Sequence, residues 1–182
     1  MNFIKNLLRS FQKTSKNIIF CDIDGTINYH YKRIQKFTLP QWPGNKISKK
    51  AFDRQEIMKD EPIKESIDAI KELRNYYEII FLTARNFKNA YSITKDWLDM
   101  HDFDYDKIIV VKNPEQKLKY LKKYKNSIFI DDLKRGYHLK ETQYYENIIR
   151  DLKINNIKFE IFKNNWHEIK KKYIDIAIKK SI

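Results

Sequence analysis

Four short, largely apolar runs, separated by segments with helical periodicity, constrain the fold of this chain more than any other feature. The runs are Ile18–Cys21, Tyr77–Leu82, Lys107–Val111 and Ser127–Ile130. Runs of this length and composition predict strands that are buried on both faces of a sheet. Because the strands alternate with helices through short connections, they predict an α/β fold, a doubly wound (Rossmann-like) parallel sheet flanked by helices.

The helices are predicted from apolar residues at helical spacing, together with residues that favour helix ends. Pro62 should begin one helix, and Asn113 should cap a later one with Pro114 at its first position. The predicted helices cover residues 1–16, 62–73, 89–100, 113–124, 142–154 and the chain from 166 onward, with a further strand near 157–162.

Length and composition predict how the chain is organised. A chain of 182 residues predicts a single domain over 1–182, with a small cap or flap insertion at about 27–60. The formal net charge of +13 favours an acidic partner. The single cysteine, Cys21, allows no internal disulfide and favours a reducing, cytoplasmic location. No apolar run approaches the roughly 20 residues of a membrane span, so no transmembrane segment is predicted.

Two aspartates follow the first predicted strand, in the stretch NIIFCDIDGT (17–26). Because side chains alternate along a strand, Asp22 and Asp24 should point the same way, past the end of the strand. Gly25 allows a sharp turn, after which the Thr26 hydroxyl can bond locally. Two carboxylates this close repel each other, and oxygen-only ligands suit Mg²⁺, so the pair predicts a magnesium site.

Polar residues also follow two of the other predicted strands. Thr83 and Arg85 come after the second strand, and Asp131 and Asp132 come after the fourth. In parallel α/β sheets, ligands bind beyond the carboxyl ends of the strands, so these groups and the first aspartate pair should converge on one crevice. Carboxylates, a hydroxyl and a guanidinium gathered in one place favour a catalytic site over a structural role.

The segment from Ile27 to Phe52 is basic and aromatic. It contains six basic residues and no acid, and its proline and glycine residues favour loops or a hairpin over a long helix. Lysine and arginine attract phosphate, and aromatic rings offer surfaces on which bases stack. Because the segment directly follows the aspartate pair, contact with a substrate is favoured over a solvated loop.

Three of these motifs together resemble the haloacid dehalogenase (HAD) superfamily of phosphotransferases. They are DIDGT (22–26), FLTAR (81–85) and FIDDL (129–133), in the order of the family, and the resemblance spans residues 18–133. FLTAR and FIDDL are also similar to the phosphatase half of polynucleotide kinase and to small 5′-nucleotidases.

The resemblance implies a role for each residue at the strand ends. Asp22 would attack phosphorus and form an aspartyl-phosphate, and Asp24 would protonate the leaving oxygen and then activate water. Thr83 would donate a hydrogen bond to the phosphoryl group, and Arg85 would contact the phosphate or the substrate. The other implied substrate contacts are Thr26, Ala84 and Lys112.

The same resemblance implies a Mg²⁺ ion and a lysine. Asp22, the backbone carbonyl of Asp24 and the acidic pair 131–132 would hold the metal. Within the pair, the second aspartate aligns with the direct ligand of the family, and the first supports it. The lysine that steadies the phosphoryl charge would be Lys117, in the first turn of a helix, or Lys112, just before the cap of that helix.

The function that this pattern favours is a Mg²⁺-dependent phosphomonoesterase acting on a nucleotide or a polynucleotide end, in the manner of a 3′-phosphatase. A small insertion should leave the crevice open to large substrates. Two alternatives stay open. A phosphatase of sugar phosphates or other small metabolites predicts turnover that is insensitive to salt and no affinity for oligonucleotides. A non-catalytic nucleic-acid-binding protein with a HAD fold predicts no Mg²⁺-dependent turnover of p-nitrophenyl phosphate.

Overall fold

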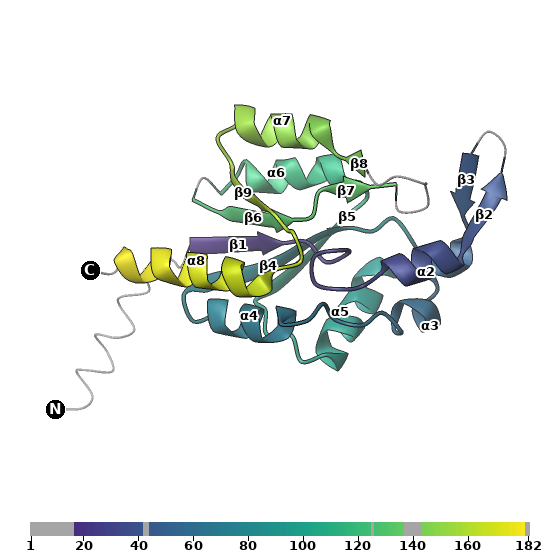
Figure 1. Cartoon of the computed structure of the whole chain (residues 1–182), viewed down its shortest axis with the longest axis horizontal. Coiled ribbons are helices and arrows are strands. Elements are labelled where there is room, and N and C mark those ends of the chain that lie inside the picture. The colour runs from purple at the N-terminus through teal and green to yellow at the C-terminus, as the bar shows by residue number, and fades with distance from the viewer. Residues whose placement is uncertain (1–16, 42–43, 125, 137–142, 181–182) are drawn as a thin grey trace.

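A sheet of five parallel strands forms the centre of the protein (Figure 1). Its strands, in spatial order, are β5 (Lys107–Val111), β4 (Tyr77–Ala84), β1 (Asn17–Cys21), β6 (Ile128–Asp131) and β9 (Lys158–Ile161). The computed structural model describes residues 17–41, 44–124, 126–136 and 143–180, so the helix predicted at 1–16 lies outside the described residues. The predicted parallel, doubly wound α/β sheet is confirmed.

The strand β1 lies in the middle of the sheet, and later strands add to both of its edges. β4 pairs with one edge of β1 and β6 pairs with the other. Cys21, the last residue of β1, lies opposite Phe81 of β4 and Ile130 of β6. The carboxyl end of β1 is therefore the point at which the strand order reverses, which is the usual position of a ligand site in such sheets.

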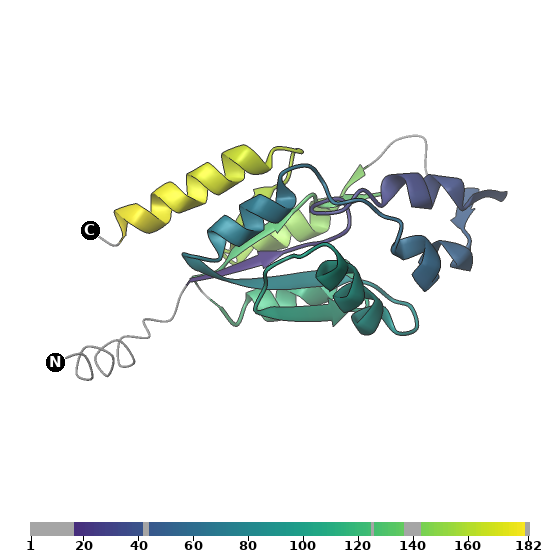
Figure 2. The same cartoon turned by 90° about the horizontal axis from the view of Figure 1, so that it is seen from below.

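Two layers of helices cover the sheet, one on each face (Figures 1 and 2). One layer consists of α4 (Ser66–Leu73), α5 (Ala90–Met100) and α8 (Trp166–Lys179). The other consists of the 3₁₀ turn η2 (Pro114–Gln116), α6 (Lys117–Leu121) and α7 (Glu146–Ile154). Each layer packs its own apolar cluster against the sheet. None of the helices that the structure describes is long and apolar enough to span a membrane.

The residues of β1 show why the strand is apolar throughout. Ile19 and Cys21 belong to the cluster beneath α4, α5 and α8, whereas Phe20 belongs to the cluster beneath α6 and α7. All three side chains are fully buried. Because neighbours on a strand point to opposite faces, a sheet covered on both sides requires an unbroken apolar run.

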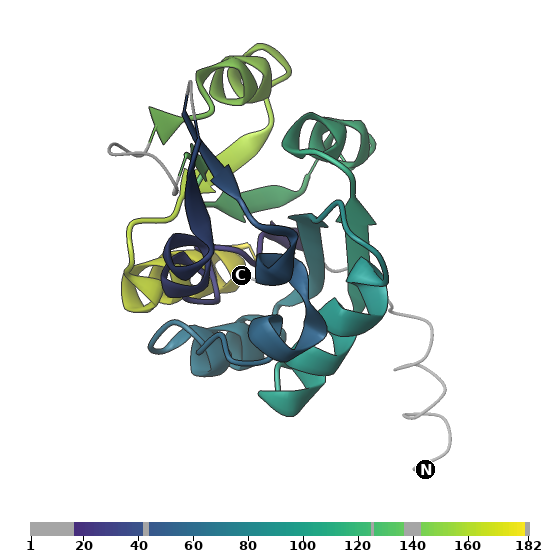
Figure 3. The ribbon, with the colours of Figure 1, turned by 90° about the vertical axis from the view of Figure 1, so that its right-hand side faces the viewer.

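Between β1 and α4 the chain makes an insertion that lies beyond the carboxyl ends of the strands (Figures 1 and 3). It consists of α2 (Tyr31–Lys36), a hairpin of β2 (Thr38–Gln41) and β3 (Gly44–Ile47), the 3₁₀ turn η1 (Lys49–Phe52) and α3 (Arg54–Ile57). Arg33 of α2 pairs with Asp60 at the far end of the insertion, at 2.9 Å. Trp97 of α5 donates its indole N–H to the Asp60 carbonyl at 2.9 Å, which fastens the insertion to the core.

The helix predicted from Pro62 begins only at Ser66. Asn28 forms an antiparallel bridge with Pro62 instead. On either side of this bridge, the N–H groups of Tyr29 and Ile63 donate to carbonyls across it, each at 2.8 Å. The pairing closes the base of the insertion and keeps the chain around Pro62 extended, so the prediction of a helix start there is wrong.

The helix predicted at 142–154 also begins later, at Glu146. The residues before it form β8 (Gln143–Tyr144), which pairs with β7 (Lys134–Arg135) in an antiparallel ladder. Because this pairing requires extended backbone, it removes the first predicted turn from the helix. β7 follows β6 after two residues and lies at the edge of the crevice.

Candidate active site

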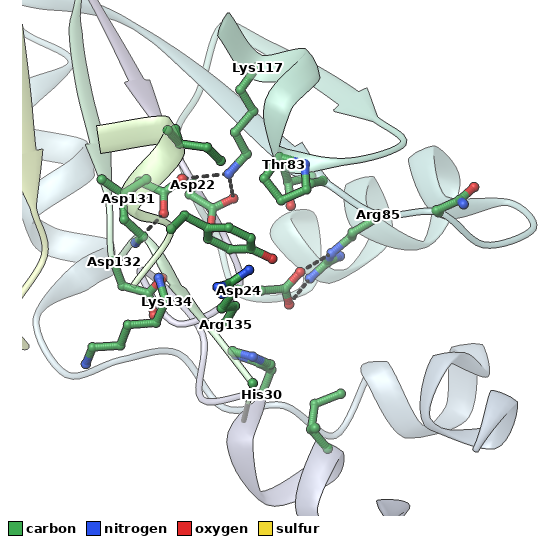
Figure 4. Close-up of a pocket in the computed structure, with 18 of the residues that line it drawn as sticks. Asp22, Asp24, His30, Thr83, Arg85, Lys117, Asp131, Asp132, Lys134 and Arg135 are labelled. Atoms are coloured by element: carbon green, nitrogen blue, oxygen red, sulfur yellow. Dashed lines mark hydrogen bonds and ion pairs between the residues drawn. The ribbon is translucent and has the colours of Figure 1, made fainter. Parts of the chain in front are cut away.

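The carboxyl ends of β1, β4 and β6 open into a cavity of about 390 Å³. Asp22 follows β1, Thr83 lies near the end of β4 and Asp131 ends β6, so neighbouring strands bring the three side chains together (Figure 4). Every residue predicted for the site except Thr26 lines this cavity. These lining residues are Asp22, Asp24, Thr83, Ala84, Arg85, Lys112, Lys117, Asp131 and Asp132.

Lys117 bridges two of the acids. Its Nζ atom lies 2.7 Å from Asp22 Oδ1 and 2.7 Å from Asp131 Oδ2, and all three side chains are buried. The Asn113 side chain accepts the Gln116 N–H at 3.1 Å and caps the turn before α6, so Lys117 stands in the first turn of that helix. Because helical side chains lean toward the N-terminus of their helix, the lysine reaches back to the strand ends.

Burial shifts the pKa values of this buried group. It raises the pKa of Asp22 to about 7, although the ammonium of Lys117 opposes the shift. Burial acts downward on Lys117, but Asp131 and Asp22 together hold the pKa of the lysine above its usual value. The lysine therefore stays charged and offsets the repulsion between the two carboxylates. Lys112, the alternative lysine, has an exposed side chain and no ion pair with either acid in the described structure.

Asp24 is held by a different cation. Arg85 donates Nε to Asp24 Oδ2 and Nη2 to Asp24 Oδ1, both at 2.8 Å, and its third nitrogen donates to the Thr94 hydroxyl at 2.8 Å. Thr94 is itself fixed, because its hydroxyl donates to the Ala90 carbonyl at 2.6 Å. Burial alone would raise the pKa of Asp24, but the Arg85 guanidinium holds it well below the usual range. Asp24 is therefore ionised in this arrangement.

Asp22, Asp131 and Asp132 form a buried acidic group that suits a metal ion. Each offers one oxygen, and these atoms lie within 4.8 Å of one another. Against three carboxylates, Lys117 supplies one positive charge, so the group suits a divalent cation, and carboxylate oxygens are ligands that Mg²⁺ prefers. Asp131 accepts the Leu133 N–H at 2.7 Å in addition to the lysine. Asp132 accepts the Lys134 N–H at 3.1 Å and the Tyr31 hydroxyl at 3.2 Å, so hydrogen bonds orient both carboxylates of the pair.

The turn after β1 brings the backbone close to Asp132. Gly25 has a φ of +83°, and a Cβ atom there would collide with the Asp132 carboxylate and the Tyr31 hydroxyl. Only glycine therefore fits this position. Thr26 is fully buried, and its hydroxyl accepts the Asp132 N–H at 3.1 Å, so it ties the turn to β6 and lies outside the cavity lining.

Thr83 supplies a hydroxyl that no described group satisfies. Its side chain is fully buried on the cavity wall, and its Oγ1 atom has no hydrogen-bond partner among the described residues. Leaving a buried polar atom without a partner costs roughly 1–3 kcal/mol. A hydroxyl kept in this state, beside an ammonium and a cluster of acids, suits a bound group that brings its own acceptor oxygen, such as a phosphoryl group.

The structure also brings residues to the cavity that no sequence motif indicated. Arg33 of the insertion lies 3.8 Å from Asp24 and lines the cavity with His30. Arg135 of β7 and Phe87, just after β4, line it as well. Arg33 belonged to the basic segment, but no local pattern distinguished it from the exposed lysines around it.

Comparison with known proteins gives matches among solved structures alone. No protein-family model and no curated protein matches the sequence. A structure of the Pnkp1/Rnl/Hen1 complex is similar at 15% identity and a TM-score of 0.49, covering 83% of this chain and 47% of that chain. A structure of the Pnkp1/Rnl/Hen1 RNA repair complex is similar at 16% identity and a TM-score of 0.49, covering 83% and 44%.

A further similar structure is that of the fission yeast RNA polymerase II CTD phosphatase Fcp1 bound to beryllium fluoride. It shares 14% identity with a TM-score of 0.37, and the match covers 97% of this chain and 54% of that chain. The chain thus spans about half the length of the solved chains that it matches. At identities this low, the function of the chain has to be inferred from the geometry of its own site.

Proposed function

We propose that this protein is a Mg²⁺-dependent phosphomonoesterase of the HAD type that transfers a phosphoryl group to Asp22. One observation carries the proposal. A buried carboxylate at the switch point of a parallel sheet faces a charged lysine at 2.7 Å, a cluster of acids and a buried hydroxyl without a partner among the described residues. A nucleophile, a cation, a metal site and a hydrogen-bond donor to the phosphoryl group are what phosphoryl transfer to a carboxylate needs.

The reaction has two steps. In the first, an Asp22 oxygen attacks phosphorus, the ester P–O bond breaks, and the leaving oxygen takes a proton from the Asp24 carboxyl group. In the second, the Asp24 carboxylate takes a proton from water as the water oxygen attacks phosphorus. The bond between phosphorus and Asp22 then breaks, which releases inorganic phosphate and restores both aspartates.

Other groups around Asp22 stabilise the transferring phosphoryl group. The Lys117 ammonium lies 2.7 Å from one oxygen of the Asp22 carboxylate, and the Thr83 hydroxyl can donate to a phosphoryl oxygen. Asp22 and Asp132 would bind Mg²⁺, with Asp131 in support and the backbone carbonyl of Asp24 as a further ligand. When bound, the ion neutralises charge between the nucleophile and the phosphate.

The ion pair of Asp24 with Arg85 has a consequence for the first step. An ionised Asp24 cannot donate a proton, so the acid must gain one when the substrate binds. A phosphate that enters beside Arg85 would compete with Asp24 for the guanidinium, and its negative charge would raise the pKa of the carboxyl group. Substrate binding would therefore prepare Asp24 for its role as an acid.

The substrate class that we propose is a nucleotide or a polynucleotide end. A cavity of about 390 Å³ falls within the range of roughly 300–1,000 Å³ that is typical of small-molecule sites, so it has room for more than a phosphate. Basic side chains, among them Lys112 and Arg135, line it. The formal net charge of +13 also favours a polyanionic partner.

The test is phosphate release in the presence of Mg²⁺ from four substrates compared side by side. They are a 3′-phosphorylated oligonucleotide, a nucleoside monophosphate, a sugar phosphate and p-nitrophenyl phosphate. We expect turnover that stops on chelation of Mg²⁺ and a phosphorylated peptide that contains Asp22. A fully active Asp22→Asn variant would overturn the mechanism, and preference for the sugar phosphate would overturn the substrate class.

A further inference from the structure

Beside the acidic residues, the cavity has an apolar wall and a basic wall that the two chemical steps do not use. Phe52 and Phe87 belong to the apolar wall, together with two isoleucines of the insertion, and Arg135 belongs to the basic wall. Phe87 follows β4 and Arg135 lies on β7 after β6, and β1 lies between β4 and β6. The two walls therefore stand on opposite sides of Asp22.

The two phenylalanines form a stacked pair. Their ring centroids lie 5.6 Å apart with an angle of 28° between the ring planes. Phe52 ends the turn η1 of the insertion, and Phe87 follows Arg85 by two residues, so the pair joins the insertion to the segment after β4 on the cavity wall. Both side chains are half-buried, which leaves apolar ring surface facing the cavity. Such a surface suits another aromatic ring.

The insertion does not depend on this pair for its attachment to the core. Trp97 donates to the Asp60 carbonyl at 2.9 Å, and Arg33 links the insertion to Asp24 at 3.8 Å. An ion pair between Arg54 and Asp96 adds a third contact. Because these contacts already hold the insertion on the core, the half-buried rings are not required for its attachment and are available to contact a substrate.

Arg135 is arranged to receive an anion. Its guanidinium lies over the Tyr145 ring, 5.6 Å from the ring centroid, and the side chain extends into the cavity (Figure 4). None of the ion pairs between the residues that the structure describes involves Arg135. The neighbouring Lys134 directs its amine away from the acids (Figure 4). A guanidinium oriented by a ring and not engaged by a carboxylate suits a phosphate, which it can bind through two donors.

We propose that Phe52, Phe87 and Arg135 determine which phosphomonoester the site accepts. The phenyl pair stacks on a ring carried by the leaving group, and Arg135 pairs with a second phosphate of the same substrate. This inference rests on the proposed phosphatase function. These three residues would select the terminal phosphate of an oligonucleotide over that of a mononucleotide or a sugar phosphate. In an oligonucleotide, a base and a neighbouring phosphodiester accompany the reacting phosphate.

The test measures each variant with four substrates that differ in whether they carry a base and whether they carry a second phosphate. A dinucleotide with a terminal phosphate has both a base and a second phosphate, and a nucleoside monophosphate has the base alone. A dinucleotide that lacks both bases has the second phosphate alone, and ribose phosphate has neither. The measured quantity is kcat/KM for each substrate with the full chain.

Each variant should lose activity only toward the substrates that carry the group its residue contacts. Phe87→Leu or Phe52→Leu should lower kcat/KM for the substrates with a base by roughly 5- to 150-fold, the range for stacking one base on an aromatic side chain, and leave ribose phosphate unchanged. Tyr91→Leu is the control, since Tyr91 is an exposed aromatic residue of α5 outside the cavity lining.

Arg135→Gln should lower kcat/KM by roughly tenfold for the substrates with a second phosphate. It should also reduce the slope of log kcat/KM against log salt by about 0.7, as expected for one lost contact to a single strand. Arg150→Gln is the matched control, because Arg150 is an exposed arginine of α7 outside the cavity lining, and it should change neither quantity.

Stacking can also be observed without turnover. In an Asp22→Asn background, a dinucleotide with a fluorescent base analogue should be quenched on binding, and the added change Phe87→Leu should abolish the quenching. Equal losses on all four substrates would assign the rings a structural role and overturn the inference while the proposed function stands. Turnover of none of the four, with no quenching, would overturn both.

Discussion

The two aspartates of the turn after β1 lie in unlike surroundings. Asp22 shares the buried ammonium of Lys117 with Asp131, and all three residues belong to the core. Asp24 forms an ion pair with Arg85, which follows β4, and Arg33 of the insertion lies 3.8 Å from it. Burial raises the pKa of Asp22, whereas the Asp24 pKa is held low by its guanidinium in spite of burial. The Asp22 half of the site is thus built by the sheet and the helix layer on it, and the Asp24 half is shared between the sheet and the insertion.

The change Asp22→Asn should have the largest effect, because it removes the proposed nucleophile, on which both proposed steps depend. We expect phosphate release to fall by roughly 10⁴-fold or more with every substrate, as when the nucleophile of a covalent enzyme is removed. The asparagine retains the size of the side chain, and Lys117 keeps Asp131 as its partner, so the variant should fold. Thermal unfolding of the variant checks the fold. Activity within tenfold of the wild type would show that Asp22 is not the nucleophile.

Asp24→Asn should depend on the leaving group in a way that Asp22→Asn does not. With an alkyl phosphate, loss of the proposed general acid should lower kcat/KM by roughly 10²- to 10⁴-fold. With p-nitrophenyl phosphate the first step needs little protonation, so the loss in kcat/KM should be smaller. The measurement is kcat/KM, which reports the first step and excludes the hydrolysis step common to all esters, for a series of esters whose leaving groups differ in pKa. An equal loss across the series would show that Asp24 does not protonate the leaving group, which would contradict the separate roles proposed for the two aspartates.

The Asp22 half of the site could be predicted from the sequence to a large extent. Its acids follow apolar runs directly, and parallel strands end at one edge, so Asp22 and Asp131 could be placed together without knowledge of any tertiary contact. The cap at Asn113 and Pro114 likewise placed Lys117 in the first turn of a helix, although the choice between Lys117 and Lys112 depended on the family resemblance. These are local patterns, and the order of strands in a doubly wound sheet converts them into neighbours in space.

The Asp24 half could not be predicted in the same way. Arg33 and Asp60 are far apart in the sequence, and each resembles the exposed charged residues around it. The pairing of Phe52 with Phe87 depends on how the insertion lies on the core, which no periodicity encodes. The start of α4 was misplaced for the same reason, since the bridge between Asn28 and Pro62 is a tertiary pairing that overrides the preference of proline for a first helical turn.

Removing the cation from each half should test whether both are comparably important to stability. Lys117→Met leaves two buried carboxylates without their ammonium, and we expect a loss of about 3–5 kcal/mol in the free energy of unfolding. Lys112→Met is the matched control, because its exposed side chain has no ion pair with these acids, and it should change stability little. Denaturant titration in the absence of Mg²⁺ measures both. A stable Lys117→Met variant would mean that the lysine does not hold the acids in place.

The corresponding change in the Asp24 half is Arg33→Met. It leaves Asp60 buried without its 2.9 Å partner, so a loss of about 3–5 kcal/mol is expected here too. Lys36 lies on the same helix in an exposed ion pair with Glu56, and Lys36→Met should cost no more than about 1 kcal/mol. The measurement is again denaturant titration. Equal effects of the two changes would show that Arg33 is not a buried anchor of the insertion.

The smallest expected effect is the stabilisation of the folded protein by Mg²⁺, which should depend on one half of the site and not on the other. At 100 times its dissociation constant, an ion that binds only the folded protein stabilises it by about 2.7 kcal/mol, which a rise in the melting temperature reports and chelation reverses. Asp132→Asn should abolish this rise, because that carboxylate belongs to the acidic group within 4.8 Å. Asp24→Asn should retain it, since the Asp24 side chain is engaged by Arg85 and only its backbone carbonyl would face the ion. If Asp24→Asn removed the rise and Asp132→Asn did not, the metal would belong to the Asp24 half, and the assignment of the two halves would have to be reversed.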